Sequence, residues 1–315
     1  MASYGVGALL ASGERSFSFE FFPPKTDEGE TRLWQALREL EPYRPSFVSI
    51  TYGAGGTTRD RTVRITKEIV EETTLTPVGH LTCVGSTRDD IHLVMAEYAD
   101  AGVSSILALR GDPPGGPGTP WVPTPGGFEH ADELIAFVCS LGTFSVGAAA
   151  FPEGHPEASS LEFDAEVLAR KADAGAEFAI TQFFFRARDY QALVERARAH
   201  GCDIPIIPGV MPVTDVAQIT RFAHLSGAEF PPELAARFAE VGDDPQAVRD
   251  LGVEVATRMC EELLDEGAPG LHFYTLNSST ATREVAEALG ALGASDRIGD
   301  DLCADAYERK SAARV

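Results

Sequence analysis

The feature that most constrains the fold of this chain is a repeated alternation of short apolar segments with amphipathic ones. Eight apolar segments are predicted as strands, at 17–22, 47–52, 78–83, 105–110, 145–150, 178–185, 204–209 and 271–276. Amphipathic segments predicted as helices lie at 28–41, 59–72, 88–101, 130–141, 162–174, 188–200, 214–224 and, after a short extra segment, 245–266. Strands that alternate with helices form parallel βαβ units, and eight such units fit a (β/α)8 barrel of about 250 residues with insertions. A doubly wound sheet is the alternative.

The length of 315 residues leaves room for one such barrel and little more. We expect a single barrel domain over residues 1–295, followed by a loosely attached tail over 296–315 that is rich in Asp, Ala and Arg. A Pro- and Gly-rich segment at 111–128 directly follows the fourth predicted strand. Long loops inside compact domains are usually functional or disordered, so this segment is a candidate for either.

The charge and the cysteines exclude several classes of protein. The chain has 26 basic and 48 acidic residues, a net charge of −22, and such a charge repels phosphate backbones, so we expect no nucleic acid as a partner. Its five cysteines are widely spaced without a CxxC pair, which supports neither a disulfide framework nor a zinc ribbon. The N-terminus lacks an apolar signal segment, and no apolar run is long enough to span a bilayer. We therefore expect a cytoplasmic protein without membrane contact; a homo-oligomer is compatible with the sequence.

Polar residues stand at the carboxyl end of nearly every predicted strand, where the active-site groups of a barrel are found. They are Glu20, Thr51, Tyr52, His80, Thr82, Arg110, Asp112, Glu153, His155, Gln182, Tyr274 and Asn277. A structural hydrogen-bond network would explain some of them, since buried polar groups need partners. It explains the whole set poorly, and the pattern indicates a polar site above an apolar core.

Glu20 is the first candidate for chemistry. In the segment 17–25 (FSFEFFPPK), alternation places Ser18 and Glu20 on one face of the strand and phenylalanines on the other, and the proline pair 23–24 ends the strand. Burial of a carboxyl group raises its pKa, and a raised carboxyl is a candidate proton donor at neutral pH. The alternative is a glutamate that meets solvent or an arginine at the end of its strand.

Three other patterns carry less weight. The segment GAGGTT at 53–58 lacks the third glycine of a dinucleotide fingerprint, so a glycine-rich turn explains it better. The His, Cys and Glu residues within 80–83 and 153–157 match no standard ligand spacing, and we expect no metal. Lys171 lies inside a predicted helix rather than at a strand end, which argues against a Schiff-base role.

Aromatic residues could form flat walls for a planar heterocycle. The candidates are the phenylalanine triplet at 183–185 together with Phe222 and Tyr274. Ordinary core packing explains most phenylalanines in a chain of this size. Gln182, at the edge of the triplet, is more informative because its amide can both donate to and accept from a pterin-like or flavin-like ring.

In combination, these blocks resemble the methylenetetrahydrofolate reductase family, in the bacterial form that has the catalytic domain alone. The matching blocks are SFEFFPPK (18–25), FVSITYGAGG (47–56), HLTC (80–83), LRGDPP (109–114), PEGHPE (152–157), DAGAEFAITQFFF (173–185), IPGVMPV (207–213) and LHFYTLN (271–277). The resemblance implies a (β/α)8 barrel that reduces 5,10-methylenetetrahydrofolate to 5-methyltetrahydrofolate and so supplies methyl groups for methionine synthesis. It also implies a ping-pong reaction, in which NADH or NADPH reduces a bound FAD and the folate then takes the hydride.

The resemblance assigns roles to individual residues. It implies that Glu20 is the general acid that protonates N10 of the folate and that Asp112 lies beside the pterin and the flavin, where its negative charge favours an N5 iminium cation. The residues expected to bind substrate are Gln182, Phe222, Tyr274 and Asn277. The residues expected to bind FAD are Thr51, His80, Arg110, Ala131, Ala149, His155, Asp164 and Lys171.

The chain also departs from the pattern of the family. Phe151 and His130 stand where many relatives have tyrosine, which removes two hydroxyl contacts, and the loop at 113–128 is longer than in short bacterial relatives. Ser278 stands where some relatives place an arginine near the folate tail. Two alternatives therefore stay open: a flavin-free reductase with direct hydride transfer from NAD(P)H to the folate iminium, and a folate-binding protein without turnover.

Overall fold

The strands form one parallel sheet. The structure is a computed structural model and describes residues 5–52, 59–116, 119–142 and 144–290. Within these residues the sheet has nine strands in the order β7-β6-β5-β4-β3-β2-β1-β9-β8. Their bounds are β1 Ser16–Phe21, β2 Phe47–Ile50, β3 Pro77–Thr82, β4 Ser105–Leu109, β5 Ser145–Ala150, β6 Phe178–Thr181, β7 Ile206–Ile207, β8 Gly209–Val210 and β9 Gly270–Tyr274.

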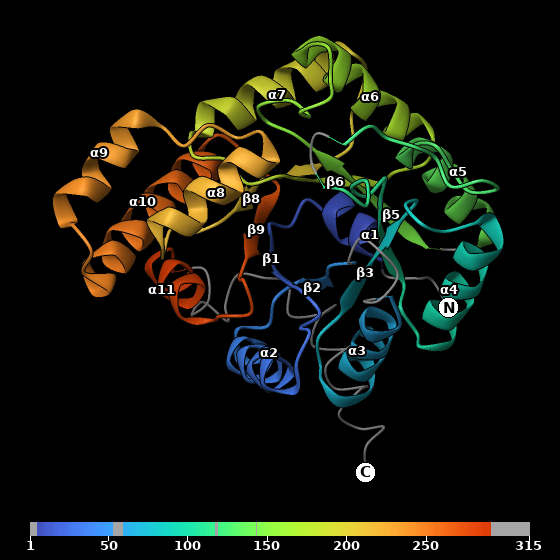
Figure 1. The fold of residues 1–315 in the computed structure, drawn as a ribbon, viewed down its shortest axis with the longest axis horizontal. Helices are drawn as coiled ribbons and strands as arrows, with labels where there is room; N and C mark the ends of the chain where they lie inside the picture. The colour runs from blue at the N-terminus through green and yellow to red at the C-terminus, as the bar shows by residue number, and fades with distance from the viewer. Residues whose placement is uncertain (1–4, 53–58, 117–118, 143, 291–315) are drawn as a thin grey trace.

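The two edges of this sheet meet, so that it closes into a barrel (Figure 1). Only Pro208 separates β7 from β8, and β7 pairs with β6 while β8 pairs with β9. Proline has no N–H for the ladder and interrupts the strand, while its carbonyl accepts a hydrogen bond of 2.9 Å from the backbone N–H of His272. β7 and β8 are therefore two halves of one strand position. The predicted (β/α)8 barrel is confirmed, and the doubly wound alternative is wrong.

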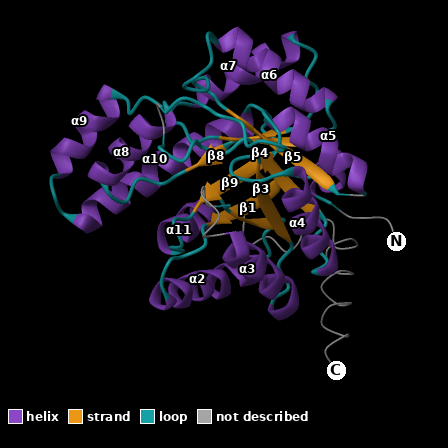
Figure 2. Ribbon diagram, turned by 45° about the vertical axis from the view of Figure 1, so that its right-hand side comes forward, coloured by secondary structure: helices purple, strands orange, loops and turns teal. Residues whose placement is uncertain are grey.

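Helices surround the barrel (Figure 2). Their bounds are α2 Asp27–Leu40, α3 Arg59–Glu72, α4 Arg88–Asp100, α5 Ala131–Leu141, α6 Leu161–Asp173, α7 Ala187–Ala199, α8 Val216–Ser226, α9 Pro232–Val241 and α10 Pro245–Asp265. They match the predicted helical segments closely, with α9 as the short extra segment. No helix among the described residues combines the length and apolar character that crossing a bilayer requires. The predicted tail at 296–315 and the segment 53–58 lie outside the described residues.

Two helices were not predicted: α1 (Val6–Ala11) and α11 (Thr280–Ala288). The backbone N–H of Val6 donates to Ser105 Oγ at 3.1 Å, and that of Gly7 donates to Ser145 Oγ at 2.8 Å. Both serines open their strands, so α1 covers the amino end of the barrel. The carboxyl ends of the strands are at the opposite end.

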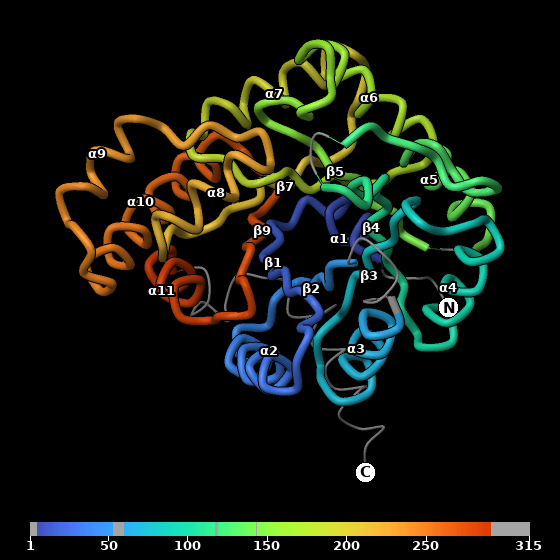
Figure 3. Tube along the Cα trace, in the orientation of Figure 1, coloured from blue at the N-terminus to red at the C-terminus, as the bar shows by residue number. Residues whose placement is uncertain are grey.

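The two faces of β1 show how the sequence builds the barrel wall. Phe19 and Phe21 are buried in one apolar cluster with Leu33 and Leu37 of α2. The other face, with Glu20, points into the barrel, as the alternation predicts. β1 also pairs with β9, which lies beside it although the two are far apart in the sequence (Figure 3). Residues from both ends of the chain therefore meet inside the barrel.

Candidate active site

Glu20 lies at the centre of a buried polar cluster inside the barrel. Its Oε2 accepts a hydrogen bond from Ser49 Oγ at 3.2 Å, and it lies 3.3 Å from His272 Nε2 and 3.4 Å from His80 Nε2. His272 Nδ1 in turn lies 2.8 Å from Ser18 Oγ. The side chain of Glu20 is only 13% exposed, and that of His272 is fully buried. Strands β1, β2, β3 and β9 each contribute to this cluster, which we call the Glu20 cluster.

The Glu20 cluster lowers the pKa of the Glu20 carboxyl group, whereas the sequence predicts a raised pKa. Burial raises the pKa of Glu20, but the hydrogen bonds from His272 and His80, together with their charge, outweigh burial and lower the pKa to about 2. The expectation of a raised pKa is therefore wrong. It was based on the aromatic strand alone, whereas two histidines from other strands face the carboxylate. Glu20 is thus an anion at neutral pH in the ligand-free protein.

His272 was missed by the sequence analysis. The signal was present, because alternation along β9 puts His272 on the same face as Tyr274, which the analysis did select. Register then places Ser18 opposite His272 and Glu20 opposite Tyr274. What local patterns could not supply is this pairing of β1 with β9.

Tyr274 and Gln182 lie at the ends of their strands, as predicted, but their polar groups have partners in the protein. The hydroxyl of Tyr274 donates to the carbonyl of Thr181 at 2.6 Å, and burial and the charge of Glu20 raise its pKa. Oε1 of Gln182 accepts a hydrogen bond from the backbone N–H of Phe183 at 2.9 Å. Phe222 of α8 packs in the same apolar cluster as Phe183 and Tyr274. Aromatic rings and one amide therefore gather at one side of the barrel.

Asn277 ties together the segments that follow β9 and β1. Its Nδ2 donates to the carbonyl of Phe22 at 2.8 Å, and its Oδ1 accepts from the N–H of Phe22 at 3.0 Å. The backbone of Asn277 has a φ of 56°, a left-handed conformation that asparagine tolerates better than most residues. Its amide thus holds the chain beside the Glu20 cluster, a role that the sequence analysis did not foresee.

A second charged cluster lies on the segments that follow β4 and β5. The guanidinium of Arg110 makes two hydrogen bonds with the carboxylate of Glu157, at 2.5 and 3.1 Å, and it lies 4.7 Å from the ring centre of Trp121. The side chain of Arg110 is 17% exposed and that of Glu157 is 41% exposed. We call Arg110, Glu157 and Trp121 the Arg110 cluster.

Several of the predicted FAD contacts lie near the Arg110 cluster. His155 Nδ1 accepts from the N–H of Glu157 at 3.1 Å, and the pKa of His155 is lowered by burial and by the charge of Arg110. Lys171 lies in α6, as predicted, and its Nζ donates to the carbonyl of Ala149 at 2.8 Å. Burial raises the pKa of Asp164 and lowers that of Lys171, while the charge of each opposes that effect in the other.

The remaining predicted residues are placed as follows. Thr51 follows β2, where its N–H donates to the carbonyl of Phe21 at 2.9 Å. Ala131 is the first residue of α5 and is buried. Asp112 is exposed directly after β4, and its charge acts on His155.

The Arg110 cluster fits the diphosphate of a flavin dinucleotide. The fork of an arginine matches phosphate oxygens, and a helix N-terminus favours an anion. At the N-terminus of α5, the side chain of the N-cap residue His130 makes no capping hydrogen bond. Within the described residues, the indole Nε1 of Trp121 is buried without a hydrogen-bond partner. In the part of the chain that the structure describes, no group of three or more His, Cys, Asp or Glu side chains has an arrangement that could hold a metal ion.

The fold and the site define the class of protein: a (β/α)8-barrel enzyme whose polar groups gather at the carboxyl ends of the strands. The profile of the family described as methylenetetrahydrofolate reductase matches residues 6–290 of the chain. The chain therefore belongs to the methylenetetrahydrofolate reductase family, and it is an oxidoreductase of folate-dependent one-carbon metabolism.

Individual relatives agree. The chain is 39% identical over 278 residues to the 5,10-methylenetetrahydrofolate reductase of Escherichia coli (strain K12), covering 88% of this chain and 92% of that one. It is 35% identical over 280 residues to methylenetetrahydrofolate reductase 1 of Schizosaccharomyces pombe, covering 88% of this chain and 46% of that one.

A solved structure shares the fold. It is an uncharacterized protein from Clostridium thermocellum that binds two copies of 5-methyl-5,6,7,8-tetrahydrofolic acid. Its TM-score is 0.60 at 12% identity, over 90% of this chain and 98% of that one. At this identity the similarity supports the barrel fold alone.

Proposed function

We propose that the protein reduces 5,10-methylenetetrahydrofolate to 5-methyltetrahydrofolate with NADH or NADPH, through bound FAD in a ping-pong reaction, and so supplies methyl groups for methionine synthesis. The observation that carries this proposal is the Glu20 cluster, a carboxylate between two histidines at the carboxyl end of the barrel. Family membership supports the substrate, because the Escherichia coli relative is named for it.

The reaction needs a proton at N10 of the folate. When N10 is protonated, the bond between N10 and the bridging methylene breaks with its electrons going to N10, and an iminium cation forms at N5. Hydride addition to the methylene carbon then gives the methyl group. A carboxylate with a pKa of about 2 holds no proton at neutral pH. We therefore assign storage of the proton to His272 and His80, and its delivery to N10 to Glu20.

The charges around the site suit an iminium cation. Glu20 becomes an anion again once it has given up its proton, and Asp112 adds a second negative charge after β4. A fixed negative charge near the developing cation lowers its energy without reorganisation. Gln182 would hydrogen-bond the pterin, and Phe222 and Tyr274, which pack in one apolar cluster, would form apolar walls. Asn277 supports this arrangement by holding the segment after β1.

The cofactor role falls to the segments that follow β4 and β5. When bound, FAD accepts a hydride from NAD(P)H and returns it to the folate. Arg110 and Lys171 would hold its diphosphate, and His155 and Asp164 border the same region. Ala131 and Ala149 have small side chains, which leave room for the cofactor. Thr51 and His80 are proposed contacts on the side facing Glu20.

The experiment is a visible spectrum of freshly purified protein, followed by an assay of NAD(P)H oxidation with methylenetetrahydrofolate. The proposal predicts an oxidised-flavin band and folate-dependent oxidation of the nicotinamide. Folate-dependent oxidation by flavin-free protein would instead establish direct hydride transfer, an alternative favoured by the missing hydroxyls at Phe151 and His130. Folate binding without any NAD(P)H oxidation would contradict both reductase mechanisms.

A further inference from the structure

The guanidinium of Arg110 is enclosed on two sides by its own chain. The carboxylate of Glu157 accepts two hydrogen bonds from the N–H edge of the guanidinium. The ring of Trp121 covers the face of the guanidinium, with its ring centre at 4.7 Å. A guanidinium offers this edge to any planar pair of oxygens, whether carboxylate or phosphate. Arg110 therefore already forms an anion receptor in the ligand-free protein, and Glu157 supplies the anion.

Glu157 is the replaceable member of this arrangement. Its side chain is 41% exposed, whereas that of Arg110 is 17% exposed. The hydrogen bond to Arg110 lowers the pKa of Glu157, so it is an anion at neutral pH. Lys171 and Arg110 act on each other as like charges. An anion on Arg110 offsets this repulsion, and a diphosphate would do so with more charge than one carboxylate.

Trp121 belongs to the long segment that follows β4. Its indole Nε1 is buried and has no hydrogen-bond partner among the described residues. A buried donor without an acceptor costs free energy, and a phosphate oxygen on Arg110 would provide that acceptor. The ring also remains stacked on the guanidinium whichever anion occupies its edge, because the face and the edge are separate surfaces.

We propose that the diphosphate of the cofactor replaces Glu157 on Arg110, and that Trp121 is a further contact of the cofactor. The proposal rests on the proposed function, which requires FAD. It assigns two residues that the sequence analysis did not place in the cofactor site. In the free protein Glu157 competes with the cofactor, so its charge lowers the affinity for FAD.

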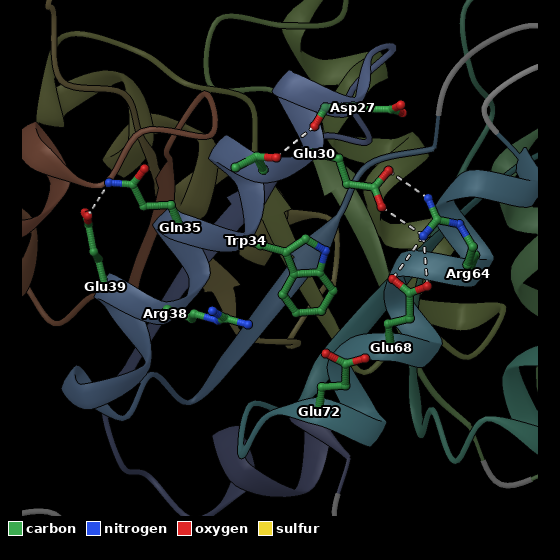
Figure 4. A pocket seen from close by; sticks show the side chains of 10 residues that line it. Asp27, Glu30, Trp34, Gln35, Arg38, Glu39, Arg64, Glu68 and Glu72 are labelled. Carbon is green, nitrogen blue, oxygen red and sulfur yellow. Dashed lines mark hydrogen bonds and ion pairs between the residues drawn. The ribbon is translucent and has the colours of Figure 1, made fainter.

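The test for Glu157 uses the fluorescence of Trp121 as the reporter. The chain has two tryptophans, and the other, Trp34, lies in an outer groove between α2 and α3 (Figure 4). Substitution Trp34→Phe therefore leaves Trp121 as the reporter, and FAD is titrated into the apoprotein. We expect strong quenching of Trp121 and, in Glu157→Gln, an affinity for FAD about fivefold tighter. Unchanged or weaker FAD binding in Glu157→Gln would overturn the replacement.

The matched control is Glu162→Gln. Glu162 also forms an exposed ion pair, in which its Oε2 lies 3.2 Å from His200 Nε2, so its partner in the described part of the chain is His200 rather than Arg110. Its substitution removes the same charge from the protein, so we expect FAD affinity within about twofold of the parent. An equal gain of affinity in Glu162→Gln would show that net charge alone is responsible and would contradict the proposal.

The role of Trp121 is tested by the intrinsic flavin fluorescence of FAD, because the substituted protein lacks the reporter. Trp121→Ala removes both the stacked ring and the N–H, and we expect FAD to bind about tenfold more weakly. Trp121→Phe keeps a ring and loses only the N–H, so its affinity should lie between those of Trp121→Ala and the parent. Equal affinity in all three proteins, each folded by circular dichroism, would remove Trp121 from the site.

Inorganic pyrophosphate separates failure of this inference from failure of the proposed function. If the protein is a flavin-free reductase, FAD will not bind. The anion site on Arg110 would still bind pyrophosphate, and the inference predicts that calorimetry gives a higher affinity for pyrophosphate in Glu157→Gln than in the parent. Absence of any difference in pyrophosphate binding, with the reductase active, overturns the inference alone. A difference without folate-dependent turnover contradicts the proposed function alone.

Discussion

The two charged clusters at the carboxyl end of the barrel are built in opposite ways. The Glu20 cluster stands on strands, and each of its side chains is positioned by the sheet. The Arg110 cluster stands on the segments after β4 and β5, and its carboxylate is much more exposed, at 41% for Glu157 against 13% for Glu20. Groups on rigid strands hold geometry well, which proton transfer needs, whereas groups on loops can exchange partners, which ligand binding needs.

The pKa values of Glu20 and Glu157 are both lowered, but by different causes. In Glu20 burial opposes ionisation, and the histidines overcome it. In Glu157 the hydrogen bond to Arg110 is the main cause, and burial is a smaller opposing effect. The first carboxylate depends on partners that can themselves release a proton, while the second depends on an arginine that cannot. Only the first cluster can therefore supply a proton.

The largest expected effect is that of Glu20→Gln on turnover. Because the amide cannot pass a proton to N10, we expect folate-dependent NAD(P)H oxidation to fall about 10³-fold. The measurement is steady-state kcat in protein whose circular dichroism matches the parent. Glu162→Gln, an exposed glutamate outside both clusters, is the control with unchanged kcat. A loss of less than about tenfold would place the acid elsewhere.

A second prediction compares the two carboxylates in acid. The pKa of Glu20 is lowered from 4.5 to about 2, so its charge stabilises the folded state above its ordinary pKa, and this contribution is lost as pH falls toward 2. The free energy of unfolding should therefore fall by up to about 3 kcal/mol more in the parent than in Glu20→Gln over this range. Glu157→Gln should follow the parent closely, because exposed pairs contribute little. The measurement is denaturant unfolding of each protein at several pH values. If the free energy of unfolding of Glu20→Gln and of the parent fell in parallel with pH, this prediction would be contradicted.

His272 sharpens the comparison from inside the Glu20 cluster. Substitution His272→Gln keeps a polar side chain but cannot store a proton, so we expect the folate step to slow about 30-fold. The dependence of this rate on pH should also differ from that of the parent, because His80 alone would then pass the proton to Glu20. A lower rate with an unchanged pH profile would make His272 a packing residue only.

The smallest expected effect is that of substituting Arg110, which lies in the Arg110 cluster, on the affinity for FAD. Lysine keeps the charge but loses the fork that binds two oxygens at once, so Arg110→Lys should bind FAD about tenfold more weakly. The folate step of the FAD-saturated variant should stay close to that of the parent. A slowed folate step at saturating FAD would mean that the two clusters do not act separately.

The comparison also shows how far the sequence could predict this molecule. The strands could be predicted because apolar residues alternate or run together within a few positions, as in β1 and β5, which appear where expected. The sixth strand ends at Thr181 rather than at residue 185, because the N–H of Phe183 bonds to the side chain of Gln182 instead of a neighbouring strand. Helix α1 was missed because it is short and has no side-chain cap to mark its start.

The candidate site was predictable in its members more than in its interactions. Polar residues at strand ends could be selected by position, so Glu20, His80 and Tyr274 were found. Their contacts could not, because Glu20 and His272 lie 252 positions apart in the chain. The pKa of Glu20 depends on this distant contact, which is why its predicted direction was wrong. Similarly, the pairing of Arg110 with Glu157 arises from two separate loops.

The measurement that tests the central claim most directly is stopped-flow analysis of Glu20→Gln in two halves. The first half follows reduction of the FAD-loaded protein by NADH or NADPH, and the second follows its reoxidation by methylenetetrahydrofolate. The account predicts that the first rate stays within about twofold of the parent, while the second falls about 10³-fold, because only the folate half needs a proton at N10. Equal slowing of both halves would contradict it and make Glu20 a structural residue.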